Sequence, residues 1–273
     1  MFIKYSGIQL NIETIINNES SGDSVIFLHG FTGSATDWVP VVSSLNKKFN
    51  YYLIDLVGHG KSDSPKEKHY YSIDSIVNQL KEIILAFPNN KIVLAGYSMG
   101  GRIALNFALQ NASLLKGLIL ESSTYGIIEE ALRKERIRQD EKLADFIDNN
   151  PIDKFIDYWM NIDFFNTQRR FSNERLSQIR EHKLENNKTG LANTLRCSGT
   201  GSMKPLYNNL KDIPVKTLLI SGELDTKFTD INAEMVKLFT NAENKNIKNA
   251  GHNTHLEEPQ RFINEINNFL LVI

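Results

Sequence analysis

The sequence predicts an α/β protein with a mostly parallel, doubly wound sheet and a helical cap inserted into that sheet. Two observations support this fold class. Short apolar runs alternate with amphipathic segments along most of the 273 residues, as strands and helices do in doubly wound sheets. Residues 124–205 interrupt the alternation, because they are charged and amphipathic and contain no strand-like run.

The strands of the sheet are predicted from continuous apolar runs, each rich in β-branched or aromatic residues and ending near Gly, Asp, Ser or Glu. Continuous runs of this kind suit a parallel sheet that is covered on both faces. The predicted strands are residues 24–30, 51–56, 91–97, 115–122 and 215–222. Ahead of them, the segment "FIKYSGIQLNIETI" predicts an antiparallel hairpin at one edge of the sheet.

Helices are predicted between the strands. Residues 72–87 carry a helical apolar stripe that Pro88 is expected to stop, and "QRFINEINNFLLVI" closes the chain in a similar fashion. The stripe consists of Ile73, Ile76, Val77, Leu80, Ile83 and Ile84.

The long helical stretch divides the chain into a first core part (1–123), an insertion (124–205) and a second core part (206–273). The insertion falls between two predicted strands. Ligands in open α/β sheets bind at the carboxyl ends of the strands, so we expect the insertion to be a lid over such a site. The alternative is a helical subdomain with a purely structural role.

Composition excludes several classes of partner. The net charge of −1 gives no basic field for nucleic acid, and no apolar run reaches the roughly 18 residues of a membrane span. Cys197 is the single cysteine, so we expect neither an intrachain disulfide nor a Cys-rich metal site, which fits a reducing cytoplasm. The first residues lack a basic-then-apolar signal pattern. We expect a cytoplasmic protein, and nothing in the sequence indicates a particular oligomeric state.

The segment "LAGYSMGGRIAL" places a serine in a turn between a predicted strand and a predicted helix. The pattern Gly96-x-Ser98-x-Gly100 at such a junction is typical of a nucleophile elbow. Small residues must flank the serine because the turn is strained, and the helix N-terminus favours negative charge there. We predict that Ser98 is a catalytic nucleophile; the alternative is a tight turn with an idle serine.

A serine of this kind needs a base, and the base needs an acid to orient it. In folds of this type the acid lies between the serine and the histidine in the chain. Asp225, in "LLISGELDTKF", follows the last predicted strand, and His252 lies in "NAGHNTHLEEP". His255 is a rival base three residues later. We prefer His252 because it directly follows the glycine that ends the apparent strand, and we expect His255 to pack or hydrogen-bond locally.

The segment "FLHGFTGSATDW" supplies a second part of the predicted site. The amide of Phe31 could pair with that of Met99 to bind an oxyanion. We expect His29, Asp55 and His59 to shape the fold without taking part in chemistry, and the two histidines His69 and His182 to lie at the surface.

The motifs H-G-F, D-x-x-G-H-G-x-S, G-Y-S-M-G-G and the final G-H together resemble the α/β-hydrolase superfamily over nearly the whole chain outside the insertion. The resemblance implies the α/β-hydrolase fold. It does not fix the reaction, because this fold hosts many chemistries.

Arg102 indicates which chemistry to expect. It lies four residues after Ser98, one helical turn along the predicted helix. Arginine is a bidentate clamp for carboxylates, whereas a pocket for a simple ester would be largely apolar. Together with arginines of the insertion, Arg102 therefore predicts a small-molecule substrate with several carboxylates. The alternative is that these arginines are solvated or paired with nearby acids.

The insertion sharpens the resemblance. "RKERIRQDEKLADFI", "YWMNIDFF", "IREHKLENNKTGLANTLRCSGTGSMKPLY" and "SGELDTKF" are similar to one branch of the superfamily, the 2-succinyl-6-hydroxy-2,4-cyclohexadiene-1-carboxylate synthases of menaquinone biosynthesis. This implies a lyase that eliminates pyruvate from 2-succinyl-5-enolpyruvyl-6-hydroxy-3-cyclohexene-1-carboxylate without a metal or organic cofactor.

The resemblance also implies roles for single residues. Ser98, Asp225 and His252 match the triad, and Phe31 and Met99 match the oxyanion-hole amides. The remaining matches are carboxylate-binding arginines and pocket aromatics: Arg102, Arg136, Arg180, Tyr97 and Trp159.

Some alternatives stay open within this resemblance. Lys183 is an alternative to Arg180 in its role, and Met203-Lys204 departs from the Gln-Pro or Gln-Ser usual in the family. A serine hydrolase, either a carboxylesterase or a carbon–carbon bond hydrolase, would use the same triad. A binding protein without activity on this fold is a further alternative, against which the complete Ser–His–Asp set argues.

Overall fold

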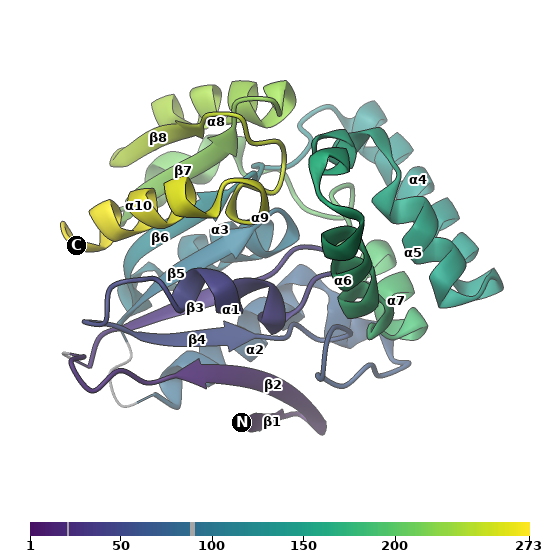
Figure 1. Ribbon diagram of the computed structural model, residues 1–273, viewed down its shortest axis with the longest axis horizontal. Helices are drawn as coiled ribbons and strands as arrows, with labels where there is room; N and C mark the ends of the chain where they lie inside the picture. The colour runs from purple at the N-terminus through teal and green to yellow at the C-terminus, as the bar shows by residue number, and fades with distance from the viewer. Residues whose placement is uncertain (21, 88–90) are drawn as a thin grey trace.

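The computed structural model describes residues 1–20, 22–87 and 91–273. Its centre is one eight-stranded sheet with the strand order β1-β2-β4-β3-β5-β6-β7-β8 (Figure 1). The strands are β1 Phe2–Tyr5, β2 Ile8–Ile15, β3 Ser24–Leu28, β4 Asn50–Ile54, β5 Ile92–Tyr97, β6 Leu115–Glu121, β7 Lys216–Gly222 and β8 Ala242–Ile247.

The sheet is mostly parallel. β1 pairs antiparallel with β2, and β2 pairs antiparallel with β4, whereas all pairs from β4 to β8 are parallel. The expected hairpin is therefore confirmed, and it occupies one edge of the sheet. The carboxyl ends of the parallel strands consequently meet along one side of the molecule.

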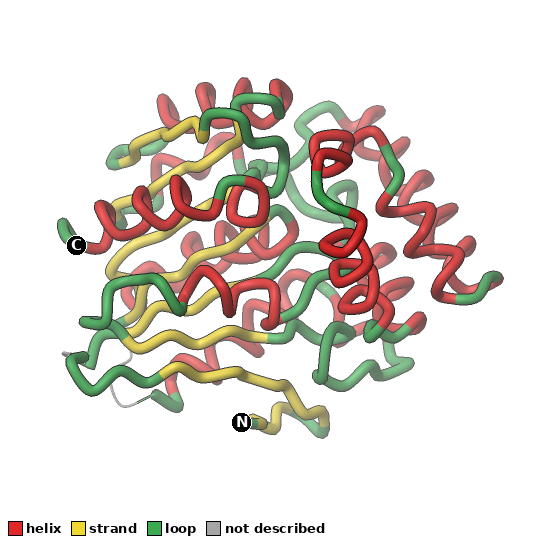
Figure 2. The backbone as a smooth tube through the Cα atoms, in the orientation of Figure 1, coloured by secondary structure: helices red, strands yellow, loops and turns green. Residues whose placement is uncertain are grey.

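Helices cover both faces of the sheet, which explains the continuous apolar runs of its central strands (Figure 2). One buried cluster joins the sheet to α2, α3 and α8, and a second joins its other face to α1 and α10. The bounds are α1 Val39–Val42, α2 Ile73–Leu85, α3 Met99–Asn111, α8 Thr226–Leu238, α9 Thr254–Glu257 and α10 Pro259–Leu270. Short 3₁₀ helices are η1 Ala35–Trp38, η2 Lys68–Tyr71, η3 Ala112–Leu114 and η5 Tyr207–Asp212.

The chain between β6 and β7 forms a separate helical group, here called the insertion, beside the carboxyl ends of the parallel strands (Figure 1). It comprises α4 Glu130–Asn149, α5 Ile152–Met160, η4 Asp163–Arg170, α6 Asn173–Leu184 and α7 Lys188–Ser198. An apolar cluster of its own, which includes Ile147, Phe155 and Leu191, holds α4, α5 and α7 together.

All five strands predicted from apolar runs are present, and so are both predicted helices. The first of these helices ends at Leu85, and Pro88, which was expected to stop it, lies outside the described residues. β8 was not among the five strands predicted from apolar runs. Its sequence, AENKNI, is polar and half-buried because it forms the edge of the sheet, so it carries no apolar run.

Candidate active site

Ser98 sits in a strained turn between β5 and α3. Its backbone has φ 50° and ψ −101°, in a region that non-glycine residues rarely adopt. The flanking glycines are needed because a side chain would not fit: a Cβ on Gly96 would collide with the carbonyl of Gly100, and one on Gly100 with the carbonyl of Leu28. The turn therefore presents the Ser98 hydroxyl at the N-terminus of α3.

His252 links Ser98 to Asp225. The Nε2 atom of His252 lies 3.0 Å from Ser98 Oγ, and its Nδ1 lies 2.6 Å from Asp225 Oδ2. The carboxylate accepts the Nδ1 proton, so Nε2 of the neutral ring is free to accept a proton from Ser98. Asp225 is held in turn as the N-cap of α8, where it accepts from the amide of Phe228.

The imidazole of His252 is shielded from water by aromatic rings. The ring centres of Phe164 and Phe228 lie 3.9 and 4.6 Å from that of His252, and the residue is only 2% exposed. This burial lowers the pKa of His252 below 6.5, although hydrogen bonding to Asp225 opposes the shift. His252 is therefore neutral at neutral pH, as a base must be.

Phe31 and Met99 line the same cavity as Ser98. Phe31 follows β3 directly after Gly30, and Met99 is the first residue of α3. Within the described residues, neither amide donates a hydrogen bond outside the helices and strands. The oxyanion-binding role expected of the two amides stays a prediction.

The cavity next to Ser98 has a volume of about 410 Å³ and is lined by both apolar and cationic side chains. Tyr97 and Trp159, both expected here, form part of its wall. Three cations also line it: Arg102, Arg136 and Lys227.

Arg102 is the most buried of these cations, at 7% exposure. Its Nη1 donates to the carbonyl of Ser198 on α7 (2.8 Å). Burial, with Arg136 nearby, lowers the pKa of Arg102 to about 10, so the group keeps its charge at neutral pH. Arg136 itself is paired with buried Asp140, Nε to Oδ1 at 2.8 Å.

Lys227 was not predicted from the sequence. It lies two residues after Asp225, at the start of α8, and its ammonium group is 5.5 Å from the centre of the Phe228 ring. Burial of the amine and the neighbouring Arg136 lower its pKa. Its position beside an expected catalytic acid was the signal in the sequence that could have identified it.

The position of Arg180 differs from the expectation. Its side chain is not among those that line the cavity and donates to Asp157 of α5 from two atoms, Nε to Oδ1 at 2.6 Å and Nη2 to Oδ2 at 3.1 Å. Lys183, the alternative from the sequence, lies one turn further along α6. Its Nζ donates to Thr32 Oγ1 (3.0 Å), and burial lowers its pKa.

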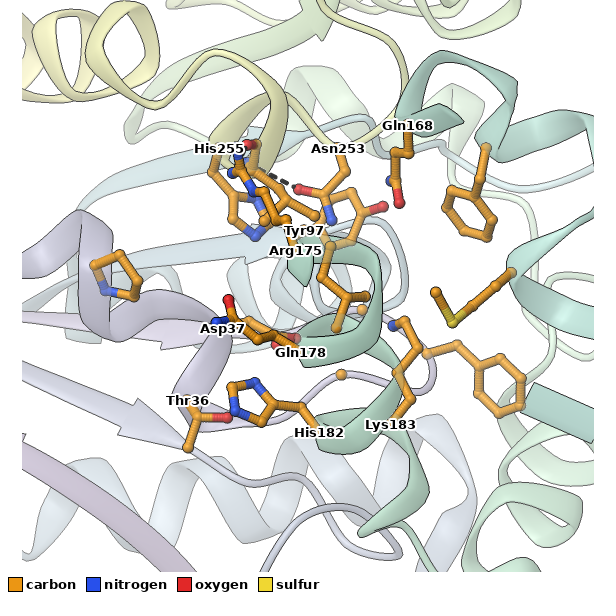
Figure 3. Close-up of a pocket in the computed structure, with 18 residues that line it drawn as sticks. Thr36, Asp37, Tyr97, Gln168, Arg175, Gln178, His182, Lys183, Asn253 and His255 are labelled. Carbon is orange, nitrogen blue, oxygen red and sulfur yellow. Dashed lines mark hydrogen bonds between the residues drawn. The ribbon is translucent and has the colours of Figure 1, made fainter. Parts of the chain in front are cut away.

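Lys183 borders a second, smaller cavity of about 220 Å³, here called the side cavity (Figure 3). Phe31, Tyr97 and Phe165 line both cavities, so the two adjoin. The side cavity lies between α6, which contributes Arg175, Gln178 and Lys183, and core residues that include Thr36 and Asp37 (Figure 3).

His255 and His29 both have local hydrogen-bond partners, as expected of His255. His255 Nδ1 lies 2.7 Å from Glu121 Oε2, and the ring of His255 stacks on Trp38 with ring centres 4.0 Å apart. Its partner is thus Glu121, and the hydrogen bond to Ser98 comes from His252. Nε2 of His29 accepts from the amide of Leu56 (3.1 Å).

Two further expectations concern the surroundings of the site. Asp55 accepts from the amides of Ala35 and Lys61, so it shapes loops of the core. Met203, which departs from the family pattern, is buried in the apolar core and does not line the cavity. Among the described residues, no group of three or more His, Cys, Asp or Glu could hold a metal ion, and no helix is long and apolar enough to cross a membrane.

Comparisons with known proteins give one consistent result. Residues 23–259 match the family described as alpha/beta hydrolase fold. A Bacillus subtilis (strain 168) protein, provisionally named 2-succinyl-6-hydroxy-2,4-cyclohexadiene-1-carboxylate synthase, is 39% identical over 93% of this chain and 92% of its own. A Yersinia enterocolitica protein named as the same synthase is 30% identical over 92% of this chain and 88% of its own.

Solved structures agree with these sequence relatives. The structure of MenH from S. aureus has a TM-score of 0.91 and 34% identity, covering 95% of this chain and 97% of its own. An enol-lactonase from Burkholderia xenovorans LB400 has a TM-score of 0.85 over 99% of this chain, but at 19% identity it shares the fold alone.

Proposed function

Because the chain belongs to the alpha/beta hydrolase fold family, in the branch of the 2-succinyl-6-hydroxy-2,4-cyclohexadiene-1-carboxylate synthases, we propose that it catalyses the reaction for which those relatives are named. The reaction eliminates pyruvate from 2-succinyl-5-enolpyruvyl-6-hydroxy-3-cyclohexene-1-carboxylate. The enzyme is thus a carbon–oxygen lyase of menaquinone biosynthesis with a Ser–His–Asp triad and no cofactor.

One observation carries this proposal beyond family membership: the cavity that holds the Ser98 hydroxyl also holds three cations, one of them buried. A neutral ester would not need Arg102, Arg136 or Lys227. A substrate with several carboxylates would, because charged hydrogen bonds in a partly desolvated site bind and orient anionic groups.

The substrate's structure defines the bonds that must break. The ring proton on C2, beside the succinyl ketone, is acidic, and the enolpyruvyl oxygen leaves from C5, the carbon on the other side of the C3–C4 double bond. Loss of the proton and of the leaving group converts the ring, which has one double bond between C3 and C4, into the conjugated 2,4-diene. The products are the diene and the enolate of pyruvate, which then takes up a proton.

The residues around Ser98 fit these steps. Ser98 Oγ removes the ring proton while its own proton passes to His252 Nε2, 3.0 Å away, and Asp225 stabilises the resulting imidazolium. Negative charge collects on the succinyl carbonyl oxygen, where the amides of Phe31 and Met99 stabilise it. No acyl-enzyme is needed, which distinguishes this use of the triad from hydrolysis.

The insertion completes the site as a lid. It contributes Arg136 and Trp159 to the cavity and packs Phe164 on His252, so closing it excludes water from the reacting atoms. We assign residues 124–205 to this lid, with 1–123 and 206–273 as the core. The cytoplasm is the compartment that suits the single cysteine.

A serine hydrolase is the second candidate, since the same Ser98–His252–Asp225 arrangement suits acyl transfer and most of the cavity wall is apolar. The two candidates differ in their intermediates. A hydrolase accumulates an acyl-enzyme on Ser98, whereas the lyase forms none.

Pyruvate release tests the proposal. The purified protein is mixed with the enolpyruvyl substrate and pyruvate is followed with a coupled assay, beside Ser98→Ala, Arg102→Ala and the surface control Arg138→Ala, whose side chain pairs with Glu135 on its own helix. We expect fast release by the wild type and the control, and strong loss in the other two. Release no faster than the spontaneous rate would reject the lyase and leave a hydrolase, to be sought by trapping an acyl-Ser98.

A further inference from the structure

The loop that carries His252 is held by the buried carboxylate of Glu257, which takes no part in the chemistry described above. Glu257 Oε2 accepts from the amide of Gly251 (2.8 Å), and its Oε1 accepts from the amide of Asn253 (3.3 Å). One carboxylate thus bridges the amides immediately before and after His252. Its side chain is 0% exposed, so the charge is fully removed from water.

A buried carboxylate needs a compensating cation, and here the cation comes from the insertion. Arg170, the last residue of η4, approaches Glu257 Oε2 at 3.4 Å. The same guanidinium donates to the carbonyl of Asn249 (2.6 Å) and to the carbonyl of Glu257 (3.4 Å), and it lies 3.6 Å from Glu258 Oε1. Arg170 therefore binds both ends of the His252 segment, residues 249–257.

Other contacts from the insertion reach the same segment. Arg175 Nη2 donates to the carbonyl of Leu256 (2.6 Å), and Arg175 lines the side cavity together with Asn253 and His255 (Figure 3). Thr167 of η4 packs so closely on Gly251 that a Cβ there would collide with its hydroxyl. Phe164, also of η4, covers the imidazole itself. A single short helix of the insertion thus touches the His252 ring, the residue before it and the carboxylate that holds its loop.

The sheet holds the His252 segment independently of the insertion. Glu121, at the end of β6, accepts from Thr254 Oγ1 (2.6 Å) and from the amide of His255 (3.0 Å). These bonds fix the residues after His252 to the core, and the Glu121 carbonyl accepts from the amide of Ser98 (2.8 Å). The carboxylate of Glu257, in contrast, is neutralised by Arg170, a residue of the insertion.

From these contacts we propose that Glu257 is a positioning residue for His252 and that Arg170 makes this positioning depend on the closed insertion. When η4 lies on the core, Arg170 neutralises Glu257, and Glu257 fixes the backbone on both sides of the base. When η4 lifts, the buried carboxylate loses its cation and draws in water, so the loop loosens. The base is therefore fully aligned with Ser98 only over a covered cavity. This inference rests on the proposed roles of Ser98 and His252.

Three changes test the inference: Glu257→Gln, Arg170→Met and Arg170→Lys. A small misplacement of a catalytic group costs up to about 100-fold in rate, so we expect kcat for pyruvate release to fall about 10- to 100-fold in Glu257→Gln and Arg170→Met. KM should change little, because neither residue lines the cavity.

Arg170→Lys should recover part of the loss, since it restores the charge. The double change Glu257→Gln with Arg170→Met should be no worse than the poorer single change. Arg138→Met is the control for removing a cation from the insertion, with kcat unchanged.

A second readout uses a small fluorophosphonate, which reports on activation of Ser98 by His252 without the substrate. Its reaction with Ser98 should slow in Glu257→Gln and Arg170→Met by a factor similar to the fall in kcat, at a temperature where each variant is folded by circular dichroism. If the wild type reacts and the variants match it, the positioning role is rejected; a loss of kcat without slower phosphonylation rejects it as well. A wild type that does not react at all would instead reject the proposed roles of Ser98 and His252.

Discussion

His252 determines how the activity responds to acid. The base works only when neutral, and burial lowers its pKa below 6.5. We therefore expect kcat/KM to be at its plateau at neutral pH and to fall as the pH is lowered, with the midpoint of the acid limb under 6.5. The measurement is kcat/KM against pH in buffers of constant ionic strength.

Asp225 supplies a second check on this assignment. Its hydrogen bond and charge raise the pKa of His252 against the effect of burial. Asp225→Asn removes both, so the acid limb should move to still lower pH while the rate at its plateau falls by about 10⁴-fold, because the ring loses the partner that fixes its tautomer. An acid limb that stays in place would mean that another group causes it.

Lys227 is expected to contribute to binding alone. Lys227 lines the cavity, and its side chain keeps contact with solvent although its amine is partly desolvated, so its interaction with a substrate carboxylate should be worth about 1 kcal/mol or less. Lys227→Met should thus raise KM by about three- to fivefold and leave kcat nearly unchanged. Steady-state kinetics of pyruvate release would measure both constants, with Lys237→Met at the other end of α8 as the control. A fall in kcat at constant KM would give Lys227 a part in the chemical step.

These side chains differ in how far the sequence could predict them. Ser98, Asp225 and His252 each lie beside the end of a strand or the start of a helix, so short motifs fix where their side chains go. Arg180 and Lys183 lie on α6, where the rotation of the helix decides which of the two faces the core. That rotation follows from packing between distant segments, such as the Lys183 bond to Thr32, which one sequence does not reveal.

Arg196 is the residue that joins two helices of the insertion. From α7 it reaches three acids of α4, with distances of 2.9 Å to Glu141, 2.6 Å to Asp145 and 2.8 Å to Asp148. Its side chain is 13% exposed, so the group is screened less than a surface pair. Arg196→Met should destabilise the insertion by about 1–2 kcal/mol.

Hydrogen exchange would locate that loss. Amides of α4 and α7 should exchange faster in Arg196→Met, whereas those of β5 and β6 should not change. Arg138→Met, which removes one exposed pair within α4, should leave both groups as they are. Faster exchange throughout the sheet would show instead that the insertion and the core unfold together.

Strands could be predicted from the sequence where burial requires them to be apolar. Strands with both faces covered carry continuous apolar runs, and those were found. β8 has a polar sequence because one of its edges has no neighbouring strand, so only its pairing with β7 reveals it. The order of the strands likewise follows from contacts between distant segments.

The molecule as a whole combines a nearly neutral charge with a cationic cavity. The net charge is −1, and yet Arg102, Arg136 and Lys227 line the space next to Ser98, where Asp140 pairs with Arg136. The fold permits this because cavity residues come from both the core and the insertion, whose remaining surfaces carry the balancing acids. The local field, not the net charge, should therefore govern the approach of an anionic substrate.

The effect of ionic strength on kcat/KM distinguishes the influence of the net charge from that of the cavity cations, because the two effects have opposite signs. Repulsion by the net charge would be screened by salt, so kcat/KM would rise, whereas attraction by the cavity would be screened and kcat/KM would fall. We expect a fall between about 0.01 and 1 M salt, over which the screening length shrinks from about 30 to 3 Å. The double change Arg102→Ala with Lys227→Met should flatten the dependence, and sucrose at matched viscosity controls for diffusion. Since the cations lie inside the cavity and the acids are spread over the surface, a rise of kcat/KM with salt would mean that the substrate does not enter as a polyanion beside Arg102.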